Sequence, residues 1–105
     1  MKIHNKLIRD KIPEIIEATG EKAVTRVLDR AEFISELETK LLEEAKEVRE
    51  TPIEKKAEEL ADVFEVMDAL VEALGFTKEQ VLEIKREKRQ ARGGFLKRLF
   101  LERTE

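Results

Sequence analysis

Two long stretches of the chain repeat apolar residues at the spacing of an α-helix, and Thr51-Pro52 separates them. The apolar positions of the first stretch are Phe33, Ile34, Leu37, Leu41, Ala45 and Val48. Those of the second form a heptad series, Ile53, Ala57, Leu60, Phe64, Met67, Val71 and Leu74, widened on one side by Val63, Val66 and Leu70. Because this spacing lines one face of a helix, the sequence predicts two long amphipathic helices that pack as an antiparallel hairpin.

Start and stop residues predict where these two helices begin and end. Asp29, with Glu32 three residues later, is a capping signal for a first long helix that runs to about Glu50. Thr51-Pro52-Ile53-Glu54 combines an N-cap threonine, a proline at the first helical position and a capping-box glutamate. The second long helix is therefore expected to begin there and to end at Gly75.

The flanking segments are shorter and carry signals of their own. Residues 11–19 are expected to form a short helix, with Asp10 as its N-cap, Pro13 in its first turn and Gly20 after its end. Residues 23–28 read as an isolated extended segment. Thr77 and Gln80 repeat the capping pattern and open a last helix that reaches about Arg92, before Gly93-Gly94.

The chain of 105 residues is therefore predicted to be one all-α domain, a helical bundle built on the two-helix hairpin. Apolar seams on both long helices need more cover than the short flanking segments provide, so we expect oligomerisation, as a homodimer or homotetramer, to complete the core. No apolar run approaches the length of a membrane span, and the first ten residues lack the apolar core of a signal peptide. A cytoplasmic location without membrane contact is expected.

The absence of cysteine excludes disulfides and thiolate metal sites, and His4 is the single histidine, which we expect to be an ordinary surface residue. Charge is divided unevenly along the chain. Residues 1–75 carry 12 Lys/Arg against 19 Asp/Glu, whereas residues 76–105 carry 9 against 5. The basic C-terminal part suits nucleic acid, a free nucleotide or an acidic partner subunit.

Four acidic residues fall on or beside the apolar faces of the two long helices. Glu44 lies near the middle of the first face and Glu47 borders it, while Glu59 and Asp62 lie within and at the margin of the widened second face. Each pair is spaced i, i+3, which places both carboxylates on one side of a helix. Antiparallel packing of the helices would bring the four acids together.

Carboxylates that converge in this way need protonation, cationic partners or a metal, because like charges repel and burying each charge costs roughly several kcal/mol of folding free energy. Oxygen ligands without His or Cys suit Mg²⁺ or Mn²⁺, which commonly complete their coordination with phosphate. The competing interpretation is a pair of solvated acidic faces with neighbouring lysines as partners. Those lysines are Lys40, Lys46, Lys55 and Lys56.

The spacing of these acids resembles a known signature. Residues 43–47 read EExxE, and residues 59–62 read ExxD. This pattern is similar to that of the MazG-like nucleotide pyrophosphohydrolases, an all-α superfamily. Three further blocks resemble a compact subgroup that is described as phosphoribosyl-ATP pyrophosphohydrolase-like: NKLIRDKIPEII (5–16), EELADVFEVMDAL (58–70) and RGGFLKR (92–98).

The resemblance implies a Mg²⁺-dependent hydrolase, with Mn²⁺ as a substitute, that cleaves a nucleoside triphosphate between the α- and β-phosphates. It assigns metal binding to Glu44, Glu47, Glu59 and Asp62, and it places Glu43 beside Glu44 and Glu47 in the catalytic group as a supporting residue. A carboxylate of this group would accept a proton from the attacking water, and which one does so stays open.

Phosphate binding also requires cations from the protein. The candidates near the start of the chain and in its basic C-terminal part are Lys6, Arg9, Lys11, Lys85, Arg89, Arg92, Lys97 and Arg98. For each of them taken alone, a surface charge or an ion pair is the favoured interpretation. A base could stack only on one of five phenylalanines, Phe33, Phe64, Phe76, Phe95 and Phe100, most of which are expected in the core.

Two other functions compete with this hydrolase. One is the hydrolysis of phosphoribosyl-ATP in histidine synthesis, which ranks lower because the dedicated enzymes lack the block at residues 5–16. The other is a non-enzymatic helical module that associates through its apolar seams and binds nucleic acid through its basic C-terminal part. That module would leave the inward-facing acids without a role, so nucleic acid is not the expected partner.

Overall fold

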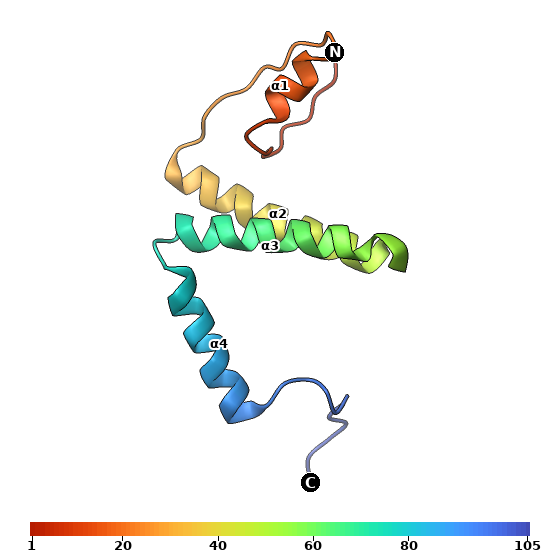
Figure 1. Cartoon of the computed structure of the whole chain (residues 1–105), viewed down its shortest axis with the longest axis vertical. Helices are drawn as coiled ribbons and strands as arrows, with labels where there is room; N and C mark the ends of the chain where they lie inside the picture. Colours follow the sequence, from red (N-terminus) through yellow and green to blue (C-terminus); the bar gives the residue numbers. More distant parts are fainter.

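The structure, a computed structural model that describes all residues 1–105, contains only helices (Figure 1). In chain order they are α1 (Ile12–Glu17), α2 (Arg30–Glu50), the 3₁₀-helix η1 (Ile53–Lys55), α3 (Lys56–Ala73) and α4 (Lys78–Arg92). The prediction of an all-α fold is confirmed. Residues 23–28, predicted as extended, join α1 to α2 and pair with no strand.

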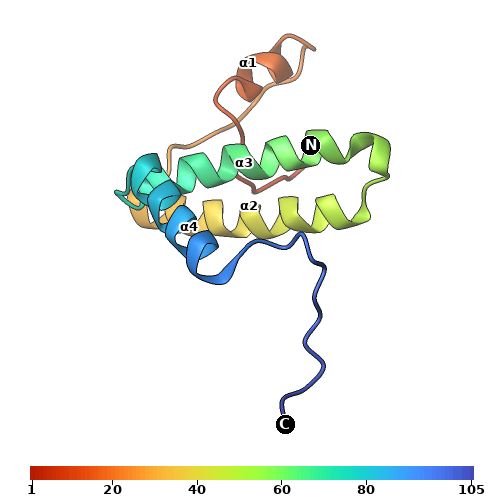
Figure 2. The same cartoon turned by 60° about the horizontal axis from the view of Figure 1, so that its bottom comes forward.

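The two long helices α2 and α3 lie side by side and antiparallel (Figure 2). A cation near the start of each helix holds the last carbonyls of the other. Arg30 donates to the carbonyl of Ala73 at 3.1 Å, and the Lys56 ammonium donates to the carbonyls of Val48 and Arg49. Since the last carbonyls of a helix have no partner within it, these two clamps satisfy exposed acceptors and fix the alignment of the hairpin.

The core of the hairpin is thin. Only Leu37 and Val66 are buried, with 3% and 6% of their surface exposed. The side of α3 that faces α2 is the widened one, where Val63 and Leu70 are half-buried beside Val66. A single hairpin of this kind buries too few side chains to form a complete domain core.

The heptad series of α3, which the sequence predicts to face the core, instead points outward. Leu60, Phe64 and Met67 are 46%, 62% and 39% exposed. At about 100° per residue, Leu60 and Met67 lie roughly a third of a turn from Val66, and Phe64 lies nearly half a turn from it, so packing Val66 against α2 turns them away. The prediction that most phenylalanines are in the core is also wrong, because only Phe33 is half-buried and the other four are exposed.

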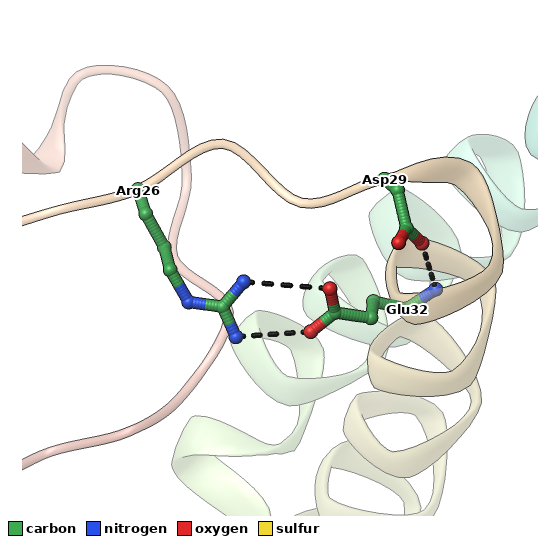
Figure 3. A network of polar contacts seen from close by, with 3 residues as sticks. All are labelled: Arg26, Asp29 and Glu32. Carbon is green, nitrogen blue, oxygen red and sulfur yellow. Dashed lines mark hydrogen bonds and ion pairs between the residues drawn. The ribbon is translucent and has the colours of Figure 1, made fainter.

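Side-chain caps start two of the helices. Asp29 accepts from the backbone N–H of Glu32 at 2.9 Å, as predicted for α2, while the Glu32 carboxylate turns to the guanidinium of Arg26 (Figure 3). At α4 the capping box is complete, because Thr77 and Gln80 each accept from the other's backbone N–H. These local signals set both helix starts correctly.

Two predicted caps are wrong. Thr51 does not cap the second long helix; its N–H donates to Glu47, which makes it the last residue of the turn that ends α2. The chain then reverses through Pro52 and one 3₁₀ turn, so α3 begins only at Lys56 and has no side-chain cap. Asp10 does not cap α1 either, since Lys11 occupies that position and the first free N–H, that of Ile12, donates to the Arg9 carbonyl.

Helix ends agree better with the sequence. Gly75 has φ +85°, its N–H donates to Glu72, and the N–H of Phe76 donates to Val71, which is the Schellman pattern of a glycine-terminated helix. Gly93 ends α4 with φ +82°. Helix α1 ends at Glu17, two residues earlier than predicted, because residues 18–20 form a turn.

The chain as a whole is open. Its radius of gyration is 18.2 Å, whereas a compact domain of this length has about 13 Å. Helix α4 leaves the hairpin at Gly75, and residues 93–105 extend from its far end without regular structure (Figures 1 and 2). None of the helices combines the length and the apolar character that crossing a bilayer requires.

Candidate metal centre

Three carboxylates meet where α2 and α3 pack against each other. Glu44 comes from α2, and Glu59 and Asp62 come from consecutive turns of α3. Each offers one oxygen to a group in which all of these atoms lie within 4.8 Å of one another, and all three residues are half-buried. The side of α3 that carries Val66 also carries these two acids, so the packing of the hairpin itself places them opposite Glu44.

Glu47, the fourth predicted ligand, is exposed and does not belong to this group of three. It lies close enough that its charge acts on Glu59. Glu43, predicted as a supporting residue, is also exposed. The structure therefore brings together three of the four predicted ligands and leaves Glu47 and Glu43 at the edge.

The electrostatics of the group are those of crowded negative charge. The pKa of the Glu59 carboxyl is raised above its ordinary value, chiefly because partial burial removes water from the charged form. The charges of Glu47, Asp62, Glu44 and Glu58 raise the pKa further, in that order. A divalent cation at this place would oppose this shift, because it favours the charged form of every surrounding carboxylate.

A lysine partly neutralises the group. The Lys40 ammonium lies 3.8 Å from a Glu44 oxygen, one turn back on α2, and the Glu44 side chain is 17% exposed. Lys46 pairs in the same way with Glu50, away from the group, whereas Lys55 forms no ion pair. Of the three carboxylates, only Glu44 therefore has a lysine partner, and the 3.8 Å between their charged atoms is long for an ion pair.

Arg9 reaches the group from the N-terminal segment. Its guanidinium donates to Asp62 Oδ1 at 2.7 Å, and both side chains are about half exposed. This is the one side-chain hydrogen bond between residues 1–25 and the helical hairpin. The sequence pointed to Arg9 as a phosphate-binding candidate but gave no sign of its pairing with Asp62, because the two residues are 53 positions apart.

The other predicted phosphate-binding cations make no ion pair with the acidic group. They are Lys6, Lys11, Lys85, Arg89, Arg92, Lys97 and Arg98. Five of them belong to α4 or the segment after it, which lie apart from the hairpin (Figure 1). The guanidinium of Arg89 lies beside Gly94 instead.

The donor set fits Mg²⁺ or Mn²⁺. Carboxylate oxygens from two rigid helices supply hard, anionic ligands, and neither His nor Cys is among them. Three protein ligands leave coordination positions for water and phosphate, which is how Mg²⁺ is usually bound. The raised pKa of Glu59, caused first by partial burial and then by the neighbouring acids, means that its charged form would gain from a nearby cation.

Comparison with known proteins gives a limited match. An uncharacterized protein of Mycolicibacterium smegmatis is 46% identical over 43 residues, which is 41% of this chain and 44% of that protein. The match thus spans less than half of the length of this relative. No family model matches the chain, and no solved structure matches it.

Proposed function

We propose that this chain is a Mg²⁺-dependent nucleoside triphosphate pyrophosphohydrolase. It cleaves the bond between the α- and β-phosphates to give the nucleoside monophosphate and pyrophosphate, and it removes unwanted nucleotides. The observation that carries the proposal is the convergence of Glu44, Glu59 and Asp62 across the hairpin. The resemblance of residues 43–47 and 59–62 to the MazG-like signature supplies the reaction.

The chain's own residues have distinct parts in this reaction. Glu44, Glu59 and Asp62 would hold the cation, with Glu47 as a further ligand from the next turn of α2. Mg²⁺ held by these residues would supply positive charge that stabilises the phosphate oxygens and lowers the pKa of a water. A carboxylate of the group accepts the proton of that water, and Glu43 orients the ligands from the edge.

Arg9 supports binding of the triphosphate. It lies beside the acidic group and is held there by Asp62. With a divalent cation on the carboxylates, the attraction between the guanidinium and Asp62 would weaken, which would leave Arg9 able to pair with a phosphate. Arg9 would then contribute a cation of the protein to triphosphate binding.

A substrate panel tests the proposal. Purified protein is incubated with Mg²⁺ and each of the common NTPs and dNTPs, and with phosphoribosyl-ATP, and the products are separated. Release of pyrophosphate and a monophosphate is expected, while release of inorganic phosphate and a diphosphate would contradict the predicted cleavage site. The rates with phosphoribosyl-ATP and ATP distinguish the general hydrolase from a histidine-pathway enzyme.

A pair of matched variants links the reaction to the acidic group. Glu44→Gln keeps the shape of the side chain but removes a metal ligand, so turnover should fall by at least about 100-fold. Glu38→Gln is the control, because Glu38 is exposed on the same helix and is outside the group. Full activity in Glu44→Gln would refute the metal assignment.

The exposed apolar side of α3 favours a second candidate, a non-enzymatic module that associates with other helices and binds nucleic acid through its basic C-terminal part. This second function would be supported by DNA or RNA binding whose affinity falls steeply with salt concentration, without hydrolysis of any nucleotide. We retain the homodimer or homotetramer as the expected assembly under either function, because the open hairpin lacks a core of its own.

A further inference from the structure

The outward side of α3 is an apolar surface four turns long. We call it the outer face of α3 and define it by Leu60, Phe64, Met67 and Leu74, all of them exposed. These positions continue the heptad series that typically forms a helix–helix contact. Helices α2 and α4 leave it uncovered, since α2 packs on the Val66 side and α4 turns away at Gly75.

The exposed surface of the whole chain is too large for an isolated domain. A compact protein of 12.2 kDa exposes about 6,000 Å², whereas this chain exposes 10047 Å². The excess of roughly 4,000 Å² exceeds what each subunit of a large obligate dimer usually buries. An interface of that extent involves more than one helix face and requires cover from outside the hairpin.

The C-terminal segment carries apolar side chains that also lack cover. Phe95 and Phe100 are 97% and 89% exposed, and Leu96 and Leu99 are nearly as open. Residues 95, 96, 99 and 100 share one side of the segment if it forms a helix, which is the pattern of a peptide that binds in a groove between or along helices. No helix of the chain covers these side chains, because each of them is at least 86% exposed.

The charges of α3 and of the C-terminal residues indicate what covers the outer face of α3. Helix α3 carries one lysine against six Asp/Glu, so two α3 helices packed on each other would repel. Residues 76–105, which we call the C-terminal arm, carry 9 Lys/Arg against 5 Asp/Glu. The arm thus offers both the apolar side chains and the positive charge that the outer face of α3 lacks.

We infer that the outer face of α3 binds the C-terminal arm of a second copy of this chain. The exchange is reciprocal: each copy gives its arm and receives the other's, which closes a two-fold dimer and covers both apolar surfaces. Phe95, Leu96, Leu99 and Phe100 pack on Leu60, Phe64 and Met67, and arm cations lie beside the acids of α3. The inference does not depend on the proposed hydrolase activity.

Cross-linking between two single-cysteine variants tests this arrangement, because the chain has no cysteine of its own. Full-length Met67→Cys and Leu99→Cys proteins are mixed, allowed to exchange and treated with a short bis-maleimide. The mixed dimer is expected in clear excess over either self-linked dimer. Leu42→Cys is the control for Met67→Cys, because Leu42 is also exposed but lies on α2.

Three outcomes of this experiment would overturn the inference. Self-linking of Met67→Cys without the mixed product means that two outer faces pack on each other. A linked monomer from the Met67→Cys/Leu99→Cys double variant, at a concentration where light scattering gives the mass of one chain, means that the arm folds onto its own hairpin. Equal linking of Leu42→Cys and Met67→Cys to Leu99→Cys means that the contact is not specific to α3.

The oligomeric state gives a second, independent measurement. Wild-type protein should have the mass of a dimer or a multiple of it, and Phe64→Lys and Phe100→Lys should each raise the dissociation constant at least tenfold while circular dichroism still shows helix. Leu42→Lys should leave it unchanged. A wild-type monomer at all concentrations would contradict the inference, as would a monomer that binds vesicles of anionic lipid through its arm.

Discussion

Arg9 and Asp62 form a hydrogen-bonded ion pair of 2.7 Å that joins the N-terminal segment to the acidic group of the hairpin. The same carboxylate is a predicted metal ligand, so the guanidinium and a divalent cation compete for it. The pair is exposed on both sides and is therefore weak enough to be displaced. Binding of a divalent cation at Asp62 would therefore be coupled to the position of the N-terminal segment.

Replacing Arg9 should affect metal binding and catalysis in opposite directions. Without the guanidinium, Arg9→Ala should bind Mn²⁺ more tightly, by no more than about fivefold, because an exposed ion pair contributes at most about 1 kcal/mol. Turnover should nevertheless fall by at least about tenfold, since a cation that stabilises the phosphates is lost. Titration calorimetry and pyrophosphate release measure the two quantities.

The Arg26→Ala variant is the control for Arg9→Ala. Arg26 forms a comparable exposed pair with Glu32 at 2.9 Å, but at the start of α2 and away from the acidic group. It should change neither metal affinity nor turnover. If Arg9→Ala and Arg26→Ala behave alike, the proposed competition at Asp62 is wrong.

The raised pKa of Glu59 predicts how the stability of the metal-free protein depends on pH. An acid with a raised pKa in the folded state binds its proton more tightly there than in the unfolded chain, so its contribution to stability is lost as the pH rises from the ordinary value of 4.5 through the raised one. Glu59→Gln removes this loss. In urea unfolding with EDTA, the free energy of unfolding of the variant should rise relative to that of the wild type between pH 4 and pH 7.

Glu65 on the same helix provides the comparison for this experiment. It is exposed, lies outside the acidic group and does not act on the pKa of Glu59, so Glu65→Gln should follow the wild-type pH dependence. Parallel curves for wild type and Glu59→Gln would show that the crowding of charge around Glu59 has no consequence for stability.

Adding Mg²⁺ should stabilise the folded protein, because the acidic group exists only when the hairpin is formed. At a Mg²⁺ concentration of 100 times its dissociation constant, the free energy of unfolding should rise by about 2.7 kcal/mol. In Glu44→Gln the effect should disappear, and without Mg²⁺ this variant should be no less stable than wild type, since one of the repelling charges is gone. Thermal unfolding with Mg²⁺ and with EDTA measures both effects, and a wild-type melting temperature that ignores Mg²⁺ would contradict the site.

Local signals in the sequence predicted much of this fold. The starts of α2 and α4 were predicted correctly because the caps at Asp29 and Thr77 act within three residues and need nothing from the rest of the chain. The same kind of signal failed at Thr51, because the chain reversal between α2 and α3 required that residue for another hydrogen bond. Competition from a neighbouring element cannot be recognised in a capping motif alone.

The orientation of α3 could not be predicted from periodicity. Its apolar residues cover two adjacent sides, and the spacing alone does not say whether Val66 or Phe64 faces α2. The acids Glu59 and Asp62 share the side of Val66, so the choice that brought them to Glu44 also exposed Phe64. The candidate site and the open outer face of α3 are thus two results of one helix rotation.

The clamp between Lys56 and the end of α2 gives a last prediction about the hairpin. The Lys56 ammonium donates to the carbonyls of Val48 and Arg49, which have no partner within α2, and Lys56 is half-buried. Lys56→Ala should therefore lower the free energy of unfolding by about 1.5 kcal/mol, a usual value for hydrogen bonds from a charged group. Lys55→Ala is the matched control, because Lys55 is exposed and bonds to no side chain or carboxylate, so its loss should stay within about 0.5 kcal/mol. Urea unfolding measures both, and equal losses would mean that the clamp does not hold α2 to α3.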